Sequence, residues 1–272
     1  MSTQADSQEK VTNRTLGLMK TQNEKIACMT AYDAAFAAVL ERSGIEVILV
    51  GDSVGMVVQG QTTTIPVTID EIIYHTQLVC RGASRAMIMA DMPFMSYSSP
   101  YDCLTNAARL MKEGGAEVVK LEWGELEIDM VRRLTECGVP VCAHLGLTPQ
   151  AIHKYGGYRV QGREVEAAKK MQEDALALEE AGADIILLEC VPMSLASEIT
   201  RQANVPVIGI GAGPECDGQI LVLYDVLDIA PGKRTRFSKN YMDIEGSIHG
   251  ALKHYVKEVK SGSFPTEEYA FK

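Results

Sequence analysis

The stretch EEAGADIILL, residues 179–188, joins the end of a polar, helix-like segment to a short apolar run through one glycine. The same order recurs in ERSGIEVILV (41–50), KEGGAEVVKL (112–121) and TECGVPVC (135–142). Glycine directly after a periodic segment is a helix stop signal, and apolar runs of this length are typical of parallel strands buried on both faces. The repeat therefore predicts an α/β fold of alternating helices and parallel strands.

Extending this pattern along the chain predicts seven strands and a weaker eighth. The strands are expected at residues 26–29, 47–50, 87–90, 118–121, 139–142, 185–188 and 207–210, with the eighth within 220–227. Helices are expected at 34–43, 69–80, 101–112, 126–137 and 165–180, with a closing helix at 246–260. Such units without a composition break favour a single (βα)8 TIM barrel over 25–272, after a polar segment at 1–24. A doubly wound open sheet is the alternative.

Composition excludes several classes of protein. The chain has 272 residues, 46% of them hydrophobic, and a formal net charge of −10. It is too hydrophobic for a disordered chain, and no apolar run approaches the roughly 20 residues that span a bilayer. The acidic balance and the lack of a basic cluster argue against nucleic acid as a partner. Seven scattered cysteines without a CxxC pair, and no signal peptide, predict reduced thiols in a cytoplasmic protein.

Polar residues follow the predicted strands at the point where each strand ends. In a parallel barrel all strand carboxyl ends open on one face, so we expect these side chains at one mouth. Four converging carboxylates would repel one another unless a cation lies between them. Because no Cys/His set has ligand spacing, the oxygen donors favour Mg²⁺ over zinc. The residues are Asp52, Asp91, Lys120, Glu122, His144 and Glu189.

Single features of this pattern have plainer interpretations. An Asp at a strand end is often a turn or N-cap residue, and a lone His there usually has a structural role. The glycine-rich turn VIGIGAG, residues 207–213, either lets backbone amides bind a phosphate or makes a tight turn beside the site. The prediction of a metal-dependent active site therefore depends on the convergence of the whole set.

A series of phrases, in order over most of the chain, resembles the ketopantoate hydroxymethyltransferase family. The residues at the predicted strand ends lie inside these phrases. They are TAYDA (30–34), LVGDSVGMVVQG (49–60), PVTIDEIIYHT (66–76), ADMPFMSY (90–97), VVKLE (118–122), AHLGLTPQ (143–150), GGYRVQG (156–162), LLECVP (187–192) and VIGIGAGPECDGQILV (207–222).

The resemblance implies a barrel of the phosphoenolpyruvate/pyruvate type and transfer of a one-carbon unit from 5,10-methylenetetrahydrofolate to 3-methyl-2-oxobutanoate. The product would be 2-dehydropantoate, in pantothenate and coenzyme A biosynthesis, formed through a Mg²⁺-stabilised enolate. Carried over by motif, Asp52, Asp91 and Glu122 bind Mg²⁺, and Glu189 is the catalytic base. Members form large homo-oligomers, so a homodecamer is expected. The side chains implied to bind the oxo acid are Asp52, Ser53, Asp91 and Lys120, with His144 in a supporting role.

The chemistry of the reaction supports these roles independently. A 2-oxo acid chelates Mg²⁺ through its keto and carboxylate oxygens, which stabilises the enolate formed when C3 loses a proton. Lys120 adds positive charge where negative charge develops. A base near C3 needs a pKa raised by partial burial, which the apolar strand before Glu189 provides, although His144 is a rival.

Two other functions share part of this pattern. A Mg²⁺-dependent lyase or aldolase on the same barrel would use the same metal and enolate, but related lyases usually carry a reactive cysteine in a KKCGH-like loop, which this chain lacks. A non-catalytic metabolite-binding barrel would not need the complete set of charged residues.

The chain departs from the family pattern at Trp123, where glycine is usual, and before Arg236, where the usual proline is missing.

Overall fold

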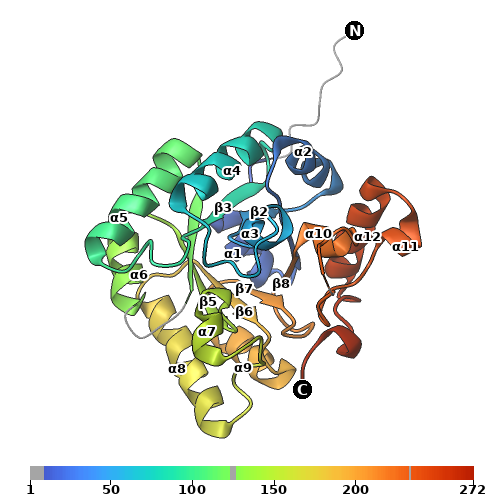
Figure 1. The fold of residues 1–272 in the computed structure, drawn as a ribbon. Coiled ribbons are helices and arrows are strands. Elements are labelled where there is room, and N and C mark those ends of the chain that lie inside the picture. The colour runs from blue at the N-terminus through green and yellow to red at the C-terminus, as the bar shows by residue number, and fades with distance from the viewer. Residues whose placement is uncertain (1–8, 123–126, 233) are drawn as a thin grey trace.

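The computed structural model describes residues 9–122, 127–232 and 234–272, which form a closed barrel of eight parallel strands (Figure 1). The strands follow chain order around the barrel, and β8 closes it by pairing with β1. The predicted (βα)8 barrel is confirmed, and the open-sheet alternative is wrong. The strands are β1 Ile26–Thr30, β2 Val47–Val50, β3 Met87–Asp91, β4 Val118–Glu122, β5 Val141–Gly146, β6 Ile185–Glu189, β7 Val207–Ile210 and β8 Gly218–Leu221.

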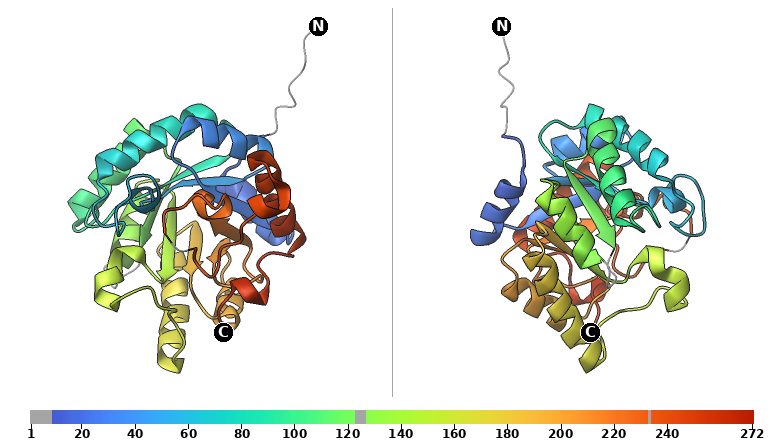
Figure 2. Two further views of the ribbon diagram at one scale, coloured as in Figure 1. Left: turned by 45° about the vertical axis from the view of Figure 1, so that its right-hand side comes forward. Right: turned by 90° about the vertical axis from the view of Figure 1, so that its left-hand side faces the viewer.

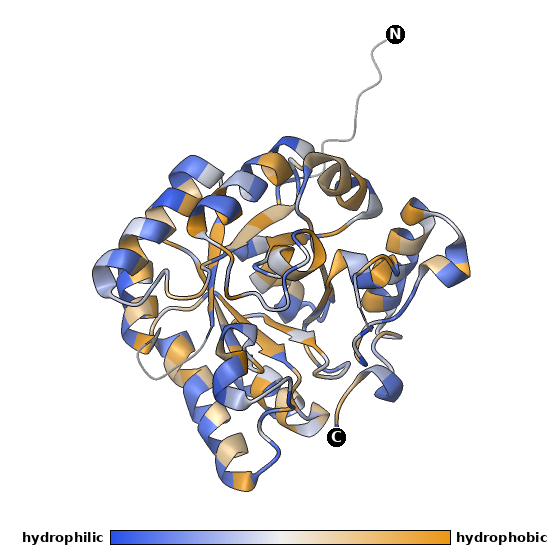
Figure 3. Ribbon diagram, viewed as in Figure 1, coloured by the Kyte–Doolittle hydropathy of each residue, from blue (hydrophilic) through white to orange (hydrophobic). Residues whose placement is uncertain are grey.

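Helices surround the barrel, and their apolar faces cover strands that are buried on both sides. In Figure 3 the strands are mostly hydrophobic in colour, whereas the outer helices carry hydrophilic stretches. The longer helices are α2 Ala34–Ser43, α4 Ile69–Gly82, α5 Pro100–Arg109, α6 Glu127–Glu136, α8 Val165–Glu180, α9 Met193–Gln202 and α12 Ile248–Ser261. Shorter ones are α3 Val54–Val57, α7 Ile152–Tyr155, α10 Leu223–Val226, α11 Met242–Glu245, the π-helical turn Leu110–Gly114 and the 3-10 turns Pro149–Ala151 and Glu267–Tyr269.

The segment before the first strand contains helix α1, Asn13–Thr21, which packs on the barrel. Lys10 pairs with Glu117 at 2.8 Å, and Lys20 pairs with Asp217 at 2.6 Å. Since these two acids directly precede β4 and β8, the helix lies at the amino-terminal end of the barrel. Figure 2 shows α1 at one end and α7 at the other. Helix α1 therefore does not cover the carboxyl ends of the strands, where the polar residues are expected.

Strand β8 begins earlier than the sequence predicted, and the expected range of 220–227 is largely wrong. The apolar pattern misses the first two residues of the strand, because Gly218 and Gln219 are not apolar. Residues 223–226, which were expected in the strand, form α10 instead. A Cβ at Gly218 would lie 2.5 Å from the carbonyl oxygen of Ile26, so only glycine fits this pairing. Trp123 and the expected helix start at residue 126 lie outside the described residues.

The structure also describes the cysteines and the lengths of the helices. All seven cysteines are free thiols in the structure. Among the helices in the described ranges, none is long and apolar enough to cross a membrane.

Candidate active site

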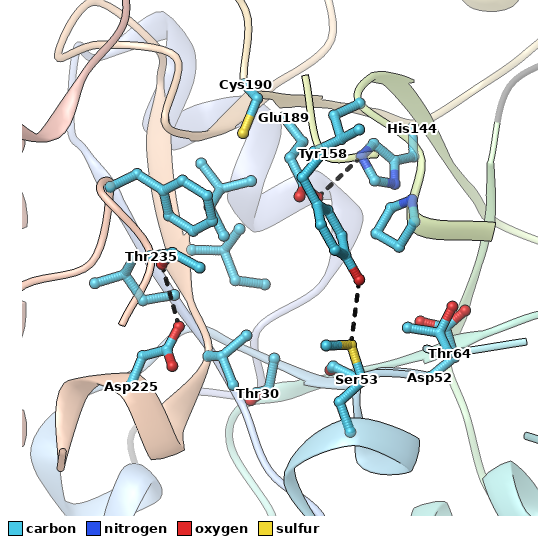
Figure 4. A pocket seen from close by; sticks show the side chains of 18 of the residues that line it. Thr30, Asp52, Ser53, Thr64, His144, Tyr158, Glu189, Cys190, Asp225 and Thr235 are labelled. Carbon is cyan, nitrogen blue, oxygen red and sulfur yellow. Dashed lines mark hydrogen bonds and ion pairs between the residues drawn. The ribbon is translucent and has the colours of Figure 1, made fainter. Parts of the chain in front are cut away.

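The strand register brings the predicted polar residues together at the carboxyl end of the barrel. Asp91 pairs with Lys120 on the next strand, and Glu122 pairs with His144. Glu189 ends β6, and Asp52 follows β2 through Gly51. Figure 4 shows several of these side chains around one cavity of about 480 Å³. All seven predicted site residues line that cavity, namely Asp52, Ser53, Asp91, Lys120, Glu122, His144 and Glu189.

Lys120 is the only basic side chain buried among these carboxylates in the described part of the cavity. Its Nζ lies 3.0 Å from Oδ1 of Asp91. Burial by itself would lower the pKa of Lys120, but attraction to Asp91, Glu122 and Asp52 raises it above its usual value. Lys120 is therefore a fixed positive charge in the cavity.

Burial raises the pKa of three of the carboxyl groups. Burial and repulsion from Asp91 raise the pKa of Asp52 to about 7, although Lys120 opposes this shift. Burial likewise raises the pKa of Glu122 well above its usual value and that of Glu189 to about 8. Lys120 supplies one positive charge against four carboxyl groups, so the cavity favours the binding of a further cation.

His144 is neutral and points toward Glu189. Burial and then the charge of Lys120 lower its pKa well below the usual value. Nδ1 of His144 lies 3.3 Å from Nζ of Lys120, and a charged lysine can only donate. Nε2 of His144 lies 3.4 Å from Oε2 of Glu189 but forms no hydrogen bond with it (Figure 4). His144 is therefore an uncharged neighbour of the Glu189 carboxylate.

Gln150 is a site residue that sequence reasoning missed. Its backbone N–H donates to Oε2 of Glu122 at 2.8 Å, and its amide donates to Oδ2 of Asp52 at 2.9 Å and to the Met92 carbonyl at 3.0 Å. The hydroxyl of Tyr97 donates to Oε1 of Gln150 at 2.6 Å. Gln150 thus fixes two carboxylates relative to each other. It ends the phrase AHLGLTPQ, but an uncharged amide in a loop carries no strand-end signal.

The donor set fits Mg²⁺ through Asp52 and Asp91. The backbone N–H of Asp52 donates to Oδ2 of Asp91 at 2.9 Å, which holds the two acids side by side. Glu122 instead turns toward the Gln150 amide. In the described ranges, no three His, Cys, Asp or Glu groups form a ready ligand set. Two carboxylates that leave positions for water and substrate oxygens match the habit of Mg²⁺.

The glycine-rich turn after β7 packs closely against the chain's C-terminal region. A Cβ at Gly211, where φ is +61°, would lie 3.1 Å from Phe237 and from Phe271. A Cβ at Gly213, where φ is +91°, would lie 2.7 Å from Met193. These contacts favour the tight-turn interpretation over phosphate binding.

The fold and the cavity define a parallel-barrel protein with an acidic mouth at the carboxyl ends of its strands. Solved barrels resemble it in fold: a phosphonopyruvate hydrolase has a TM-score of 0.59 and 14% identity, covering 79% of this chain and 80% of that chain. A 2,3-dimethylmalate lyase, described as a PEP mutase/isocitrate lyase superfamily member, has a TM-score of 0.53 and 15% identity, covering 72% and 70%. At these identities the likeness shows the fold alone.

Sequence comparison gives the family. The model for ketopantoate hydroxymethyltransferase matches residues 10–267. The 3-methyl-2-oxobutanoate hydroxymethyltransferase of Nitrosococcus oceani is 56% identical, covering 93% of this chain and 96% of that protein. The enzyme of the same name from Alkalilimnicola ehrlichii is also 56% identical, covering 96% and 94%. The chain therefore belongs to the ketopantoate hydroxymethyltransferase family and is a hydroxymethyltransferase enzyme.

Proposed function

We propose that this chain transfers a hydroxymethyl unit from 5,10-methylenetetrahydrofolate to 3-methyl-2-oxobutanoate. The product is 2-dehydropantoate, used in pantothenate and coenzyme A biosynthesis. The observation that carries the proposal is the set of four carboxylates in the cavity of Lys120, three of them buried, in a chain that belongs to a hydroxymethyltransferase family. Family membership favours this reaction over the lyase alternative.

The oxo acid binds at the polar end of the cavity. Asp52 and Asp91 would hold Mg²⁺, which, when bound, withdraws charge from the keto oxygen and acidifies C3. Lys120 places its ammonium group where negative charge develops as the enolate forms. Ser53 lies at the same edge, with its Oγ held 2.8 Å from the hydroxyl of Tyr32.

Glu189 removes the proton from C3. Its pKa of about 8 makes the ionised carboxylate a stronger base than an ordinary glutamate. The neutral His144, whose Nε2 lies 3.4 Å from Oε2 of Glu189, supports the site as an uncharged neighbour of the base. The enolate carbon then attacks the methylene carbon of the folate donor, and water supplies the hydroxyl group. The methylene carbon gives up both of its bonds to folate nitrogen and gains one bond to C3 and one to the water oxygen. The two folate nitrogens take up the proton from C3 and one proton from water, which yields tetrahydrofolate.

The activity is tested with purified protein, Mg²⁺, the oxo acid and 5,10-methylenetetrahydrofolate. We expect 2-dehydropantoate, identified by mass, and no product when the folate is omitted. Glu189→Gln should still bind the oxo acid but lose exchange of its C3 proton in deuterated water. Exchange at the wild-type rate in that variant would assign the base role to another residue.

We further propose that the chain assembles as a cytoplasmic homodecamer. Free cysteines suit a reducing compartment. The proposal rests on the resemblance to a family whose members form large homo-oligomers, and Tyr101 and Val165, 77% and 80% exposed in the single chain, are candidate contact residues. Native mass spectrometry should give ten times the 29.6 kDa of one chain, and a monomer at micromolar concentration would contradict the proposal.

A further inference from the structure

The cavity has a second wall that the proposed proton transfer does not use. Figure 4 shows Asp225 and Thr235 across the cavity from His144 and Asp52. Asp225 lies on α10, directly after β8, and Thr235 lies in the loop that follows. This wall therefore faces the same space as the oxo-acid site but is built from the C-terminal part of the chain.

Asp225 is a buried acid with few partners. Asp225 is only 9% exposed, and its Oδ2 accepts a long hydrogen bond of 3.4 Å from the Thr235 hydroxyl. The nearby Arg234 forms its salt bridge with Asp228 instead. Within the described residues, no other donor reaches the Asp225 carboxylate. A carboxylate has about four lone-pair sites, so most of its acceptor capacity is left for a ligand.

The surroundings of Asp225 are apolar and partly aromatic. Ile210, Ile220, Phe237 and Phe271 line the same cavity as Asp225, and Ile220 lies on β8, the strand before it. Apolar walls with a single buried carboxylate suit a flat heteroaromatic ring that presents two neighbouring N–H donors on one edge.

Two arginines line the same cavity and are exposed to solvent. Neither Arg159 nor Arg236 forms a salt bridge with an acidic side chain in the described part of the chain. Arg236 donates only a long hydrogen bond of 3.4 Å to the Glu268 carbonyl, and its guanidinium lies 5.3 Å from the centre of the Phe271 ring. In a chain with a net charge of −10, unpaired arginines at one cavity favour an anionic ligand group there.

We propose that this wall is the subsite for the folate donor. Asp225 accepts hydrogen bonds from N3–H and the 2-amino group of a 2-amino-4-oxopteridine ring, and Ile220 and Phe237 pack against that ring. Arg159 and Arg236 bind the carboxylates of the glutamate tail. The inference rests on the proposed function, because that function supplies a folate as the second substrate.

Asp225→Asn tests the ring contact, with Asp228→Asn as a matched control from the same loop. The asparagine keeps the shape but loses the charge and one acceptor oxygen, so KM for 5,10-methylenetetrahydrofolate should rise about 10- to 100-fold. Exchange of the C3 proton of the oxo acid, which uses no folate, should stay within about twofold, because it needs only the opposite wall. Asp228→Asn should change neither quantity.

Three outcomes would overturn the assignment of Asp225. They are an unchanged KM in Asp225→Asn, an equal rise in Asp228→Asn, and loss of exchange together with a lowered melting temperature, which would indicate a structural role. A wild-type protein that exchanges the proton but makes no 2-dehydropantoate would instead contradict the proposed function.

The arginines are tested with two probes that differ only in the tail. Titration calorimetry should show that Arg159→Ala and Arg236→Ala each weaken tetrahydrofolate binding by about 5- to 20-fold. Binding of tetrahydropteroate, which has the same ring but no glutamate, should be unchanged. Equal weakening of both probes would contradict the contact with the tail.

Discussion

The rate of C3 proton exchange should rise about tenfold between pH 7 and pH 9 and then level off. The cause is the buried carboxyl of Glu189, whose pKa is raised to about 8. A raised pKa depletes the basic form on the acid side, so about a tenth of the groups are ionised at pH 7 and about nine tenths at pH 9. Only the ionised form accepts the proton.

The assay follows the C3 proton signal of 3-methyl-2-oxobutanoate by NMR in deuterated water, without folate. Because the pKa of Asp52 is raised to about 7, Mg²⁺ occupancy also changes over this range. Mg²⁺ and the oxo acid therefore have to be saturating at each pH, which a titration of each checks. A parallel sample without protein gives the uncatalysed rate to be subtracted.

Two variants separate the candidate bases. Glu189→Gln should lower the exchange rate about 10²- to 10⁴-fold and remove the rise with pH. His144→Asn should slow exchange less and keep the midpoint near 8, because the imidazole is neutral in the cavity. A flat profile in the wild type, a midpoint near 4.5, or loss of the inflection only in His144→Asn would refute the role of Glu189.

Three further predictions address the metal site and the framework around it. Gln150→Ala should weaken Mg²⁺ binding about tenfold in calorimetry, because Oδ2 of Asp52 loses its amide donor, and native affinity would contradict this. At about 100 times its Kd, Mg²⁺ should stabilise the wild type by about 2.7 kcal/mol in thermal melts, and Asp52→Ala or Asp91→Ala should abolish most of that gain. Gly146→Ala should cost about 2–4 kcal/mol in urea unfolding, because φ is +96° and the new Cβ would lie 2.2 Å from the Glu189 carbonyl oxygen; unchanged stability would refute this steric argument.

Much of the fold was predictable because one local signal repeats around a parallel barrel. The predicted helices at 34–43 and 165–180 coincide with α2 and α8. Errors occur where polar residues enter a strand. Strand β5 continues to Gly146 rather than ending at residue 142, since His144 faces the cavity and interrupts the apolar run. Polar site residues therefore interrupt the apolar sequence pattern of the strands that carry them, and the strand ends are predicted too early.

The site was predictable only where charge follows an apolar strand. That signal marks Asp91, Lys120 and Glu189, all of which line the cavity. It does not mark Gln150, which is uncharged and acts by bridging carboxylates from different strands. Nor does it mark Asp225, because the short strand before it was assigned too late in the chain. Contacts between loops depend on distances that periodicity does not encode.

The charges of the cavity explain why Glu189, rather than another carboxylate, suits the role of base. Lys120 and a divalent cation would supply three positive charges, which match the charges of Asp52, Asp91 and Glu122. Glu189 is then the acid left without a cationic partner of its own, and its only close polar neighbour among the described side chains is the neutral His144. Burial, with repulsion from Asp52 and Asp91, raises its pKa to about 8 although Lys120 opposes the shift, and an acid with such a pKa both takes and returns a proton near neutral pH.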